Sequence, residues 1–319
     1  MTDTIVAVLV EHRGSEVAQP TLESLTLART MGSPVAVWMG EEPPADGIAL
    51  LGEYGAVEVR VLDIGEGARL PATAAAAVGA ATADAAVVLM VSTFATKEIA
   101  TRVALATGAG VVVDAARAEL IDGRVETTQT VFAATWNVRT RINADRAIVT
   151  LRPNTTQAAP AENPGAAEVV SVIPMLPEVR ETVVSVTPVE RAEGVPLSEA
   201  AVVVAGGRGT SGDYTLVREL ADVLGGAVGA SRDATDEGWI SHEHMVGQTG
   251  TTVTPALYVA CGISGAVYHR GGMQASGTIV AVNIDPDAAI FEIADIGIVG
   301  DLNDVLPQAI ETIKAHRGA

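Results

Sequence analysis

The sequence contains a single cysteine, Cys261, among 319 residues. This scarcity excludes an intramolecular disulfide and any metal site built from cysteines alone. Free cysteines are usually buried in proteins, so we expect Cys261 to be a small residue of the core. Uncharged apolar runs of about 18 residues are also missing, because Asp84 interrupts the alanine-rich segment 72–91. The sequence therefore predicts no membrane-spanning helix.

Basic residues are scarce. The chain has 20 lysines and arginines against 39 aspartates and glutamates, a net charge of −19 that is spread over both halves. A surface without a basic face repels phosphate backbones and anionic lipids, so we expect no nucleic-acid partner and no direct membrane insertion. A basic leader with a cleavage site is also missing before the apolar run Ile5–Val10. This start predicts a cytoplasmic protein.

Catalytic motifs are missing as well. The sequence has no nucleophile elbow, no P-loop lysine and no paired catalytic acids, so hydrolysis and phosphoryl transfer lack their machinery. His242 and His244 stand two residues apart without a convincing third ligand nearby, which does not favour a metal site. The prediction is a protein that binds a ligand, holds no metal and has no substrate turnover of its own.

Short apolar runs alternate with helical patterns through the first half. Because the apolar runs lack polar residues at alternate positions, they indicate parallel strands covered on both faces, and the fold class predicted is α/β with a doubly wound parallel sheet. Asp122-Gly123 suits a type I′ turn between Ala118–Ile121 and Val125–Val131, which predicts a closing hairpin. The elements expected before it are strand Ile5–Val10, helix Thr21–Met31, strand Val35–Met39, helix Gly47–Tyr54, strand Val57–Leu62, helix Ala72–Ala83, strand Ala86–Val91, helix Lys97–Ala106 and strand Val111–Val113.

Two segments interrupt these patterns. Arg152–Gly165 is rich in proline, alanine and asparagine, which predicts a surface loop. Val183–Ser198 contains two prolines, a glycine and several charges, so we place a domain linker there. The strand composition of Val183–Val189 leaves an edge strand as the alternative. Since 319 residues exceed the usual size of one domain, the predicted domains are 1–190 and 191–319.

The second half resumes the strand and helix alternation, which predicts a second doubly wound parallel sheet. Its strand ends are rich in glycine, at Gly206–Gly209, Gly229–Arg232 and Gly262–Gly265, whereas those of the first half are not. Ligands of open parallel sheets bind beyond these ends, and glycine lets the backbone approach a phosphate closely. We therefore expect the ligand site in the second half. The expected elements are strand Ala201–Ala205, helix Tyr214–Leu224, a strand at Val228, strand Leu257–Cys261, helix Gly265–Met273, strand Thr278–Val282, strand Ile296–Val299 and helix Val305–His316.

One glycine loop, Gly207–Gly212, satisfies the dinucleotide pattern G-x-G-x-x-G between a strand and a helix. The acidic residue that would bind the ribose hydroxyl about 20 residues later is missing. Ser231-Arg232 stands there instead, which suits a 2′-phosphate or another binding mode. A plain strand-to-helix turn is the alternative for this loop.

Two further residues suit a ligand site. Arg232 is the one basic residue between Arg218 and Arg270, and a guanidinium at a strand end can meet an anion with two hydrogen bonds. A solvated surface arginine is the alternative. His269 lies one turn into a predicted helix that faces the expected site, stacked over Gly265, with a core or capping histidine as the alternative.

Six motifs in order carry a resemblance to a known family. They are Val204–Gly209, Val228–Arg232, Val246–Gly250, Gly262–Ala266 with His269, Ile279–Asn283 with Asp285-Pro286, and Gly297–Leu302. With them the region from Ala201 to His316 resembles the alpha subunit of electron transfer flavoprotein, and Thr96–Ala106 with Gly108–Asp114 resembles it more loosely. The resemblance implies a Rossmann-like FAD-binding domain at 191–319 and an N-terminal domain, 1–190, of nucleotide-hydrolase-like fold that contacts the beta subunit.

The resemblance also implies roles for single residues. Tyr268 stands where many members carry an amide side chain. The residues that would hold the ADP moiety and pyrophosphate are Arg208, Ser231, Gly265, Asn283, Asp301 and Leu302. Those that would surround the isoalloxazine are Arg232, Val246, Gly247, Gln248, Thr249 and His269, and the contact set is completed by Gly250, Ser264, Ala266, Val267 and Tyr268.

By this resemblance the protein is an electron carrier in a heterodimer, whose beta subunit holds AMP or a second nucleotide. It would accept electrons from dehydrogenases, foremost the acyl-CoA dehydrogenases of fatty acid beta-oxidation, and pass them singly, through an anionic semiquinone, to a quinone-reductase-type acceptor. Arg232 and His269 would stabilise the negative charge, and Thr249 would bond at the N5 edge. The alternatives are an electron-bifurcating member of the family, an NADP-dependent oxidoreductase and an adenine-nucleotide-binding regulatory module.

Overall fold

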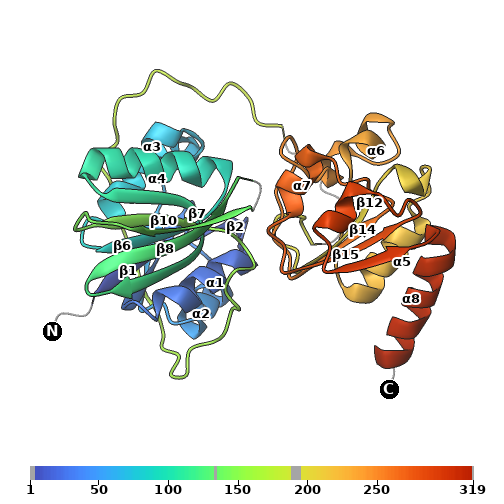
Figure 1. The fold of residues 1–319 in the computed structure, drawn as a ribbon. Helices are drawn as coiled ribbons and strands as arrows, with labels where there is room; N and C mark the ends of the chain where they lie inside the picture. The colour runs from blue at the N-terminus through green and yellow to red at the C-terminus, as the bar shows by residue number, and fades with distance from the viewer. Residues whose placement is uncertain (1–3, 133–134, 188–194, 318–319) are drawn as a thin grey trace. The chain divides into compact units, whose positions relative to one another are not determined.

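The computed structural model describes residues 4–132, 135–187 and 195–317. The chain forms two compact units, Met1–Gln129 with Asn137–Val189 and Thr130–Trp136 with Glu190–Ala319 (Figure 1). Each unit contains a parallel sheet flanked by helices, which confirms the predicted fold class. Of the predicted linker, residues 183–187 form no strand, contrary to the edge-strand alternative there, and residues 188–194 lie outside the described part.

Nine strands form the sheet of the first unit within the described residues, in the order β11-β5-β4-β1-β6-β10-β7-β8-β9. The strands are β1 Ile5–Leu9, β4 Ser33–Met39, β5 Glu58–Leu62, β6 Val87–Val91, β7 Gly110–Ile121, β8 Arg124–Val131, β9 Trp136–Arg141, β10 Ala147–Leu151 and β11 Glu168–Ser171. The helices are α1 Gln19–Ala28, α2 Ala45–Glu53, α3 Pro71–Ala81 and α4 Phe94–Thr107, with a 3-10 turn η1 at Gly65–Arg69 and a short hairpin of β2 His12–Arg13 and β3 Glu16–Val17.

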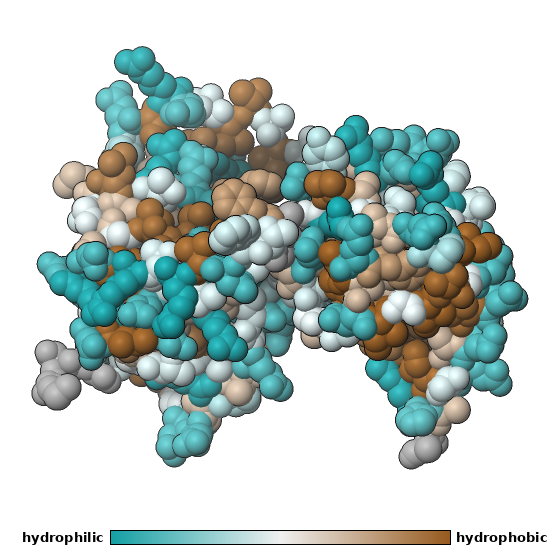
Figure 2. All heavy atoms as spheres, viewed as in Figure 1, coloured by the Kyte–Doolittle hydropathy of each residue, from teal (hydrophilic) through white to brown (hydrophobic). Residues whose placement is uncertain are grey.

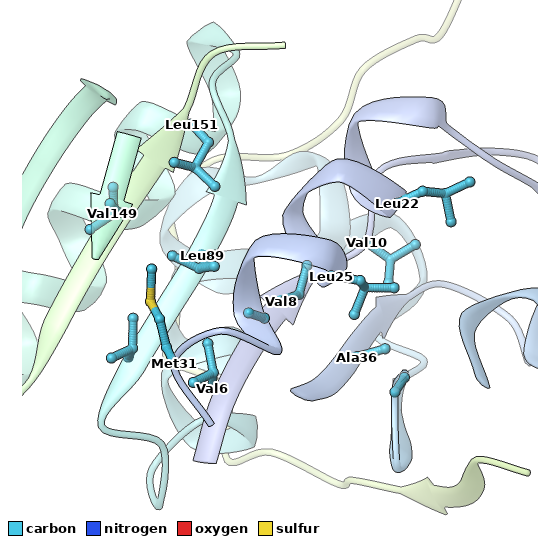
Figure 3. Packing of buried hydrophobic residues seen from close by; sticks show 14 of the residues in the cluster. Val6, Val8, Val10, Leu22, Leu25, Met31, Ala36, Leu89, Val149 and Leu151 are labelled. Atoms are coloured by element: carbon cyan, nitrogen blue, oxygen red, sulfur yellow. The ribbon is translucent and has the colours of Figure 1, made fainter. Parts of the chain in front are cut away.

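Both faces of this sheet are covered. Val6 and Val8 of β1 pack with Leu25 of α1 in one core cluster, which Figure 3 shows from close by. Ala7 and Leu9, the alternate residues of the same strand, belong to a second cluster with α3 and α4. Because successive side chains of a strand point to opposite faces, a strand buried on both sides has to be apolar throughout.

The antiparallel extension follows the predicted hairpin. Asp122 and Gly123 have φ of 49° and 73°, as a type I′ turn requires, and join β7 to β8. The two predicted strands Val111–Val113 and Ala118–Ile121 are one continuous strand, β7, with a register irregularity at Asp114, where φ is 58°.

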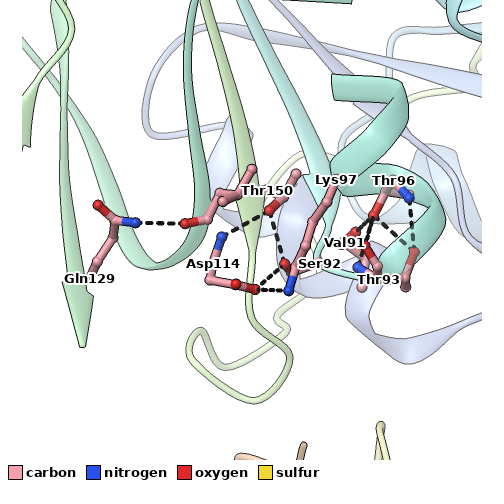
Figure 4. A network of polar contacts seen from close by, with 9 residues as sticks. Val91, Ser92, Thr93, Thr96, Lys97, Asp114, Gln129 and Thr150 are labelled. Atoms are coloured by element: carbon pink, nitrogen blue, oxygen red, sulfur yellow. Dashed lines mark hydrogen bonds and ion pairs between the residues drawn. The ribbon is translucent and has the colours of Figure 1, made fainter. Parts of the chain in front are cut away.

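A polar network supports this irregularity (Figure 4). The amide of Asp114 donates to the Thr150 hydroxyl at 2.9 Å, and its carboxylate accepts from Ser92 at 2.5 Å and pairs with Lys97 at 2.8 Å. The side chains thereby replace a ladder hydrogen bond that the bulge interrupts. These side chains therefore satisfy one another at the carboxyl edge of the first sheet.

The second unit contains a parallel sheet of five strands among the described residues, in the order β13-β12-β14-β15-β16. Its strands are β12 Val202–Gly206, β13 Ala227–Ala230, β14 Leu257–Cys261, β15 Thr278–Asn283 and β16 Ile296–Val299. Its helices are α5 Thr215–Leu224, α6 Arg232–Asp236, α7 Val267–Met273 and α8 Leu302–Arg317, with 3-10 turns η2 Arg208–Thr210, η3 His242–His244 and η4 Ala289–Glu292. Cys261 is fully buried in this core, as predicted, and burial raises the pKa of its thiol to about 12.

The connections of this sheet define where a ligand can bind. The chain runs from β12 outward to β13 and then returns to β14 on the other side of β12. The loops after β12 and β14 therefore leave the sheet in opposite directions and open a crevice at its carboxyl edge.

The surface of the chain agrees with its composition. On the face seen in Figure 2, hydrophilic residues occupy most of the rim of each unit, with smaller apolar areas between them. In the part of the chain that the structure describes, no helix combines the length and the apolar character needed to cross a membrane.

Candidate functional site

A cavity of about 470 Å³ lies at this crevice of the second unit. The loops that follow β12, β13, β14 and β15 all contribute to its walls, together with the segment before β14 and the start of α7. The lining residues are Arg208, Gly209, Ser231, Arg232, Asp233, Val246, Gly247, Thr249, Gly262, Ile263, Ser264, Ala266, Tyr268, His269, Asn283, Asp285 and Ala288. The ligand site expected in the second half thus coincides with a cavity.

The loop Gly207–Gly212 differs from a dinucleotide fingerprint. The amide of Gly207 donates to the carbonyl of Cys261 at 2.9 Å, and that of Gly209 donates to Gly262 at 3.0 Å. The 3-10 turn η2 follows, and α5 begins only at Thr215. Because these amides bond to the protein and do not open a helix, the loop lacks the pyrophosphate cradle of that motif. The alternative of a plain turn is the better description.

Two arginines stand at the rim of the cavity. Arg208 pairs with Asp233 at 3.0 Å, and Arg232 pairs with Asp236 at 3.1 Å. Their side chains are 69% and 65% exposed, and ion pairs in such positions contribute little stability. Both guanidinium groups are therefore available to exchange these carboxylates for an anionic ligand.

Ser231 and Asn283 line the cavity and also shape it. The hydroxyl of Ser231 accepts a hydrogen bond from the amide of Ala234 at 3.4 Å and caps α6. The amide group of Asn283 donates to the carbonyl of Ile263 at 2.9 Å and accepts from the amide of Asp285 at 3.0 Å. Asn283 thus ties together the loops that follow β14 and β15.

The segment from Val246 to Gly250 packs against α7. The amide of Gln248 donates to the carbonyl of Tyr268 at 2.9 Å, and a Cβ atom on Gly272 would lie 2.3 Å from Cα of Gly247. Only glycine permits this approach of two backbones. It brings Val246, Gly247 and the exposed Thr249 to the same wall as His269.

His269 is buried, with 7% of its surface exposed. Its Nε2 atom lies 2.9 Å from the hydroxyl of Tyr258. Nδ1 is buried and makes no hydrogen bond of good geometry among the described residues, but the carbonyl of Val246 lies near the ring and acts to raise its pKa. Burial dominates and lowers the pKa of His269 to about 4, so the ring is neutral near pH 7. The histidine is therefore both a core residue and a lining residue.

Tyr258 was not predicted from the sequence. It lies in the middle of β14, is fully buried, and burial raises the pKa of its hydroxyl well above 10. One signal was available, because a tyrosine within an apolar strand needs a buried partner for its hydroxyl.

Several predicted site residues lie beside the cavity and do not line it. Leu302 is the first residue of α8 and packs in the core, and the carboxylate of Asp301 accepts from the amide of Asn303 at 2.8 Å. Helix α7 begins at Val267, so Gly265 precedes the helix and His269 does not stack over it; a Cβ on Gly265 would lie 2.3 Å from the amide of Ile290. The predicted residues outside the lining set are Gln248, Gly250, Gly265, Val267, Asp301 and Leu302.

The lining set also includes residues absent from the predicted contact set: Gly209, Asp233, Gly262, Ile263, Asp285 and Ala288. Gly209, Asp233 and Ile263 directly adjoin a predicted residue in a strand-end loop, and that position was the signal that could have identified them. His242 and His244 take no part in the cavity; Nδ1 of His244 lies 2.8 Å from the carbonyl of Val228. Throughout residues 4–132, 135–187 and 195–317, His, Cys, Asp and Glu form no group of three placed to hold a metal ion.

Comparison with known proteins adds to this geometry. Residues 6–175 match the family described as electron transfer flavoprotein domain, and residues 196–274 match the electron transfer flavoprotein FAD-binding domain. The chain is 41% identical over 321 residues to the electron transfer flavoprotein subunit alpha of Mycobacterium leprae, covering 98% of each protein. It is 36% identical over 315 residues to that of Syntrophomonas wolfei, covering 96% of this chain and 98% of the other. With that of Thermoanaerobacterium thermosaccharolyticum it shares 55% identity over 139 residues, 43% of this chain and 42% of the relative.

Proposed function

This chain belongs to the electron transfer flavoprotein family as an alpha subunit, and we propose that it binds FAD in the cavity of its second unit. In a heterodimer with a beta subunit it accepts electrons from dehydrogenases, acyl-CoA dehydrogenases foremost, and passes them one at a time to a quinone-reductase-type acceptor. The beta subunit holds AMP or a second nucleotide. The single observation that carries the proposal is the cavity at the carboxyl edge of the sheet, most of whose walls come from residues 196–274.

The residues of the cavity fit the proposed cofactor. Its volume of about 470 Å³ lies within the range of about 300 to 1,000 Å³ that small-molecule sites occupy. Arg208 supplies an exposed guanidinium group for the pyrophosphate and Arg232 one for the isoalloxazine, and both are held by exposed ion pairs. His269 places its buried, neutral imidazole at the same wall, where it can pack against the ligand.

The cofactor supplies the two-electron and one-electron redox chemistry that side chains lack. The protein contributes binding and electrostatics. Arg208 and Arg232 bring positive charge to a strongly acidic chain and thereby favour the negatively charged groups of the ligand. The hydroxyl of Thr249 is exposed at the cavity, where it can donate or accept a hydrogen bond.

Two residues restrict water at the site. Val246 is buried at the wall, and Tyr268 is 67% exposed, so its ring is free to pack on a planar ligand. Displacing water from the cavity strengthens each charge interaction within it. The tyrosine takes the place of the amide expected in the family, so an aromatic ring with a hydroxyl is available for this contact.

The test is to co-express this chain with its beta subunit and record the absorbance of the purified heterodimer during stepwise anaerobic reduction. We expect flavin bands in a ratio of one FAD per heterodimer, bleached by a reduced acyl-CoA dehydrogenase in the presence of its substrate. A folded heterodimer that takes up no flavin would contradict the proposal.

Neither competing function gains support from a specific contact. The NADP alternative relied on Gly207–Gly212, whose amides bond to other parts of the backbone. Binding of NADPH by a flavin-free heterodimer would be needed to restore it. An electron-bifurcating role would be recognised by reduction of two acceptors of different potential from one donor.

A further inference from the structure

Tyr258 contacts His269 but does not line the cavity itself. It can therefore influence the cavity only through the histidine. Tyr258 is fully buried on the face of β14 that packs against α7, and it is not among the lining residues. Its hydroxyl lies 2.9 Å from Nε2 of His269, and the two rings meet edge to face, with centroids 6.1 Å apart and planes at 61°. The orientation of the imidazole is therefore set from beneath the cavity.

The direction of the hydrogen bond between Tyr258 and His269 follows from the acceptors that are available to the proton of each residue. The Tyr258 hydroxyl has one proton, and His269 is its one hydrogen-bond partner among the residues that the structure describes. If Nε2 donated to the tyrosine oxygen, the hydroxyl proton would be buried without an acceptor, and the carbonyl of Val246 near the ring would have no ring N–H to accept from. Tyr258 therefore donates, and Nε2 accepts.

The proton of the neutral imidazole then has one place left. Because the ring is buried, it carries a single proton near neutral pH, and Nε2 is occupied as an acceptor. Nδ1 carries the hydrogen, a position that the carbonyl of Val246 near the ring favours. The wall of the cavity thus holds an uncharged ring.

We propose that Tyr258 is a positioning residue that holds His269 as the neutral Nδ1–H tautomer, so that the FAD site meets an uncharged ring and not a cation at this wall. The consequence for FAD binding rests on the proposed function, but the tautomer of His269 is a property of this chain with or without FAD. Positive charge at the ligand then comes from Arg208 and Arg232 and not from His269.

The tautomer can be read in the full-length chain by NMR after labelling its histidines with ¹⁵N in the ring. We expect the Nε2 resonance of His269 in the range of an unprotonated nitrogen and Nδ1 in the range of a protonated one at pH 7.5, with the signals assigned by their loss in His269→Gln. In Tyr258→Phe the tautomers become mixed. Tyr214→Phe is the matched control, because it removes a buried hydroxyl of the same unit that donates to Gly206 at 2.9 Å, away from the histidine.

A second readout uses the heterodimer. Loss of one hydrogen bond to the ring predicts that Tyr258→Phe raises the dissociation constant for FAD about fivefold, whereas Tyr214→Phe leaves it unchanged. A protonated Nε2 in the wild-type chain would overturn the inference even if the variant failed to fold. An unchanged tautomer in a folded Tyr258→Phe chain would overturn it as well. A heterodimer without flavin would remove the proposed function, while the NMR result would still decide the tautomer.

Discussion

Gly209 and Gly262 lie backbone against backbone at the carboxyl edge of the second sheet. The amide of Gly209 donates to the carbonyl of Gly262 at 3.0 Å, and a Cβ atom on either residue would lie 2.6 Å from Cα of the other. Gly262 also has φ of 63°. Glycine at these two positions therefore permits contact between two loops of the protein, in addition to any approach of a ligand, and this contact forms part of the cavity wall.

Replacement of Gly262 by alanine is predicted to destabilise the second unit. The substitution strains a left-handed backbone and forces the Gly209 loop away, which together lower the free energy of unfolding by about 2 to 4 kcal/mol. Gly225→Ala is the matched control, since it has φ of 69° but no atom within 4 Å of the added Cβ. Urea denaturation of both variants measures the difference, and equal losses would show that the loop contact contributes nothing.

Removal of the Arg232 guanidinium is predicted to weaken FAD binding. Arg232→Ala takes away a charged donor at the rim, so the dissociation constant for FAD should rise about tenfold or more, with a smaller difference at high salt. The first reduction potential of the bound flavin should fall, since positive charge favours the reduced anion. Titration of the heterodimer with FAD and a spectroelectrochemical titration measure both. Arg218→Ala, on α5 and outside this cavity, serves as the control, and equal effects of the two variants would contradict the assignment.

The buried imidazole of His269 predicts a loss of stability in acid. Burial lowers its pKa from 6.5 to about 4 in the folded chain. The unfolded chain therefore binds an extra proton as the pH falls below about 6.5. The contribution of the neutral histidine to the free energy of unfolding is present in full above that pH and is lost toward pH 4. The free energy of unfolding of the wild type, minus that of His269→Gln, should decrease by about 3 kcal/mol between pH 7 and pH 4. Chemical denaturation across this range is the measurement, and a difference that stays constant would mean that the histidine titrates normally.

In the first unit, the burial of Glu23 predicts a pH dependence of stability of the opposite sign. Burial raises the pKa of this carboxyl from 4.5 to about 7, although the amide of Asn154 donates to it at 2.8 Å. The folded chain keeps the proton that the unfolded chain has lost, so this contribution is present in full below pH 4.5 and lost as the pH rises through 7. Glu23→Gln should therefore be more stable than the wild type at pH 8, by about 1 to 2 kcal/mol after allowance for solvent screening, and nearly equal at pH 4.5. The exposed Glu42→Gln is the control in the same denaturation series, and a Glu23→Gln chain that is less stable at pH 8 would refute the prediction.

Many elements of the fold followed from local patterns. The strand Leu257–Cys261 and the turn at Asp122-Gly123 appear where the apolar run and the turn residues predicted them. Strand β10, Ala147–Leu151, was missed although it is fully buried in the centre of the first sheet. It enters between β6 and β7, and so short an apolar run reveals its place only through those neighbours.

The candidate site, too, was predictable from the sequence only in part. Glycine at successive strand ends located it at one edge of one sheet, because that edge follows from the direction of parallel strands. The cavity wall itself depends on contacts between loops that the sequence separates widely, such as those of Asn283 with Ile263.

By itself the sequence determined the alternation of strands and helices, the glycine-rich edge and the family motifs, since each depends on residues close together along the chain. Only the tertiary structure decided that Gly207–Gly212 bonds to a neighbouring loop and that Tyr258 lies against His269. Both relationships arise when strands β12 and β14 become neighbours and α7 packs on the sheet, and such long-range packing has no local pattern that announces it.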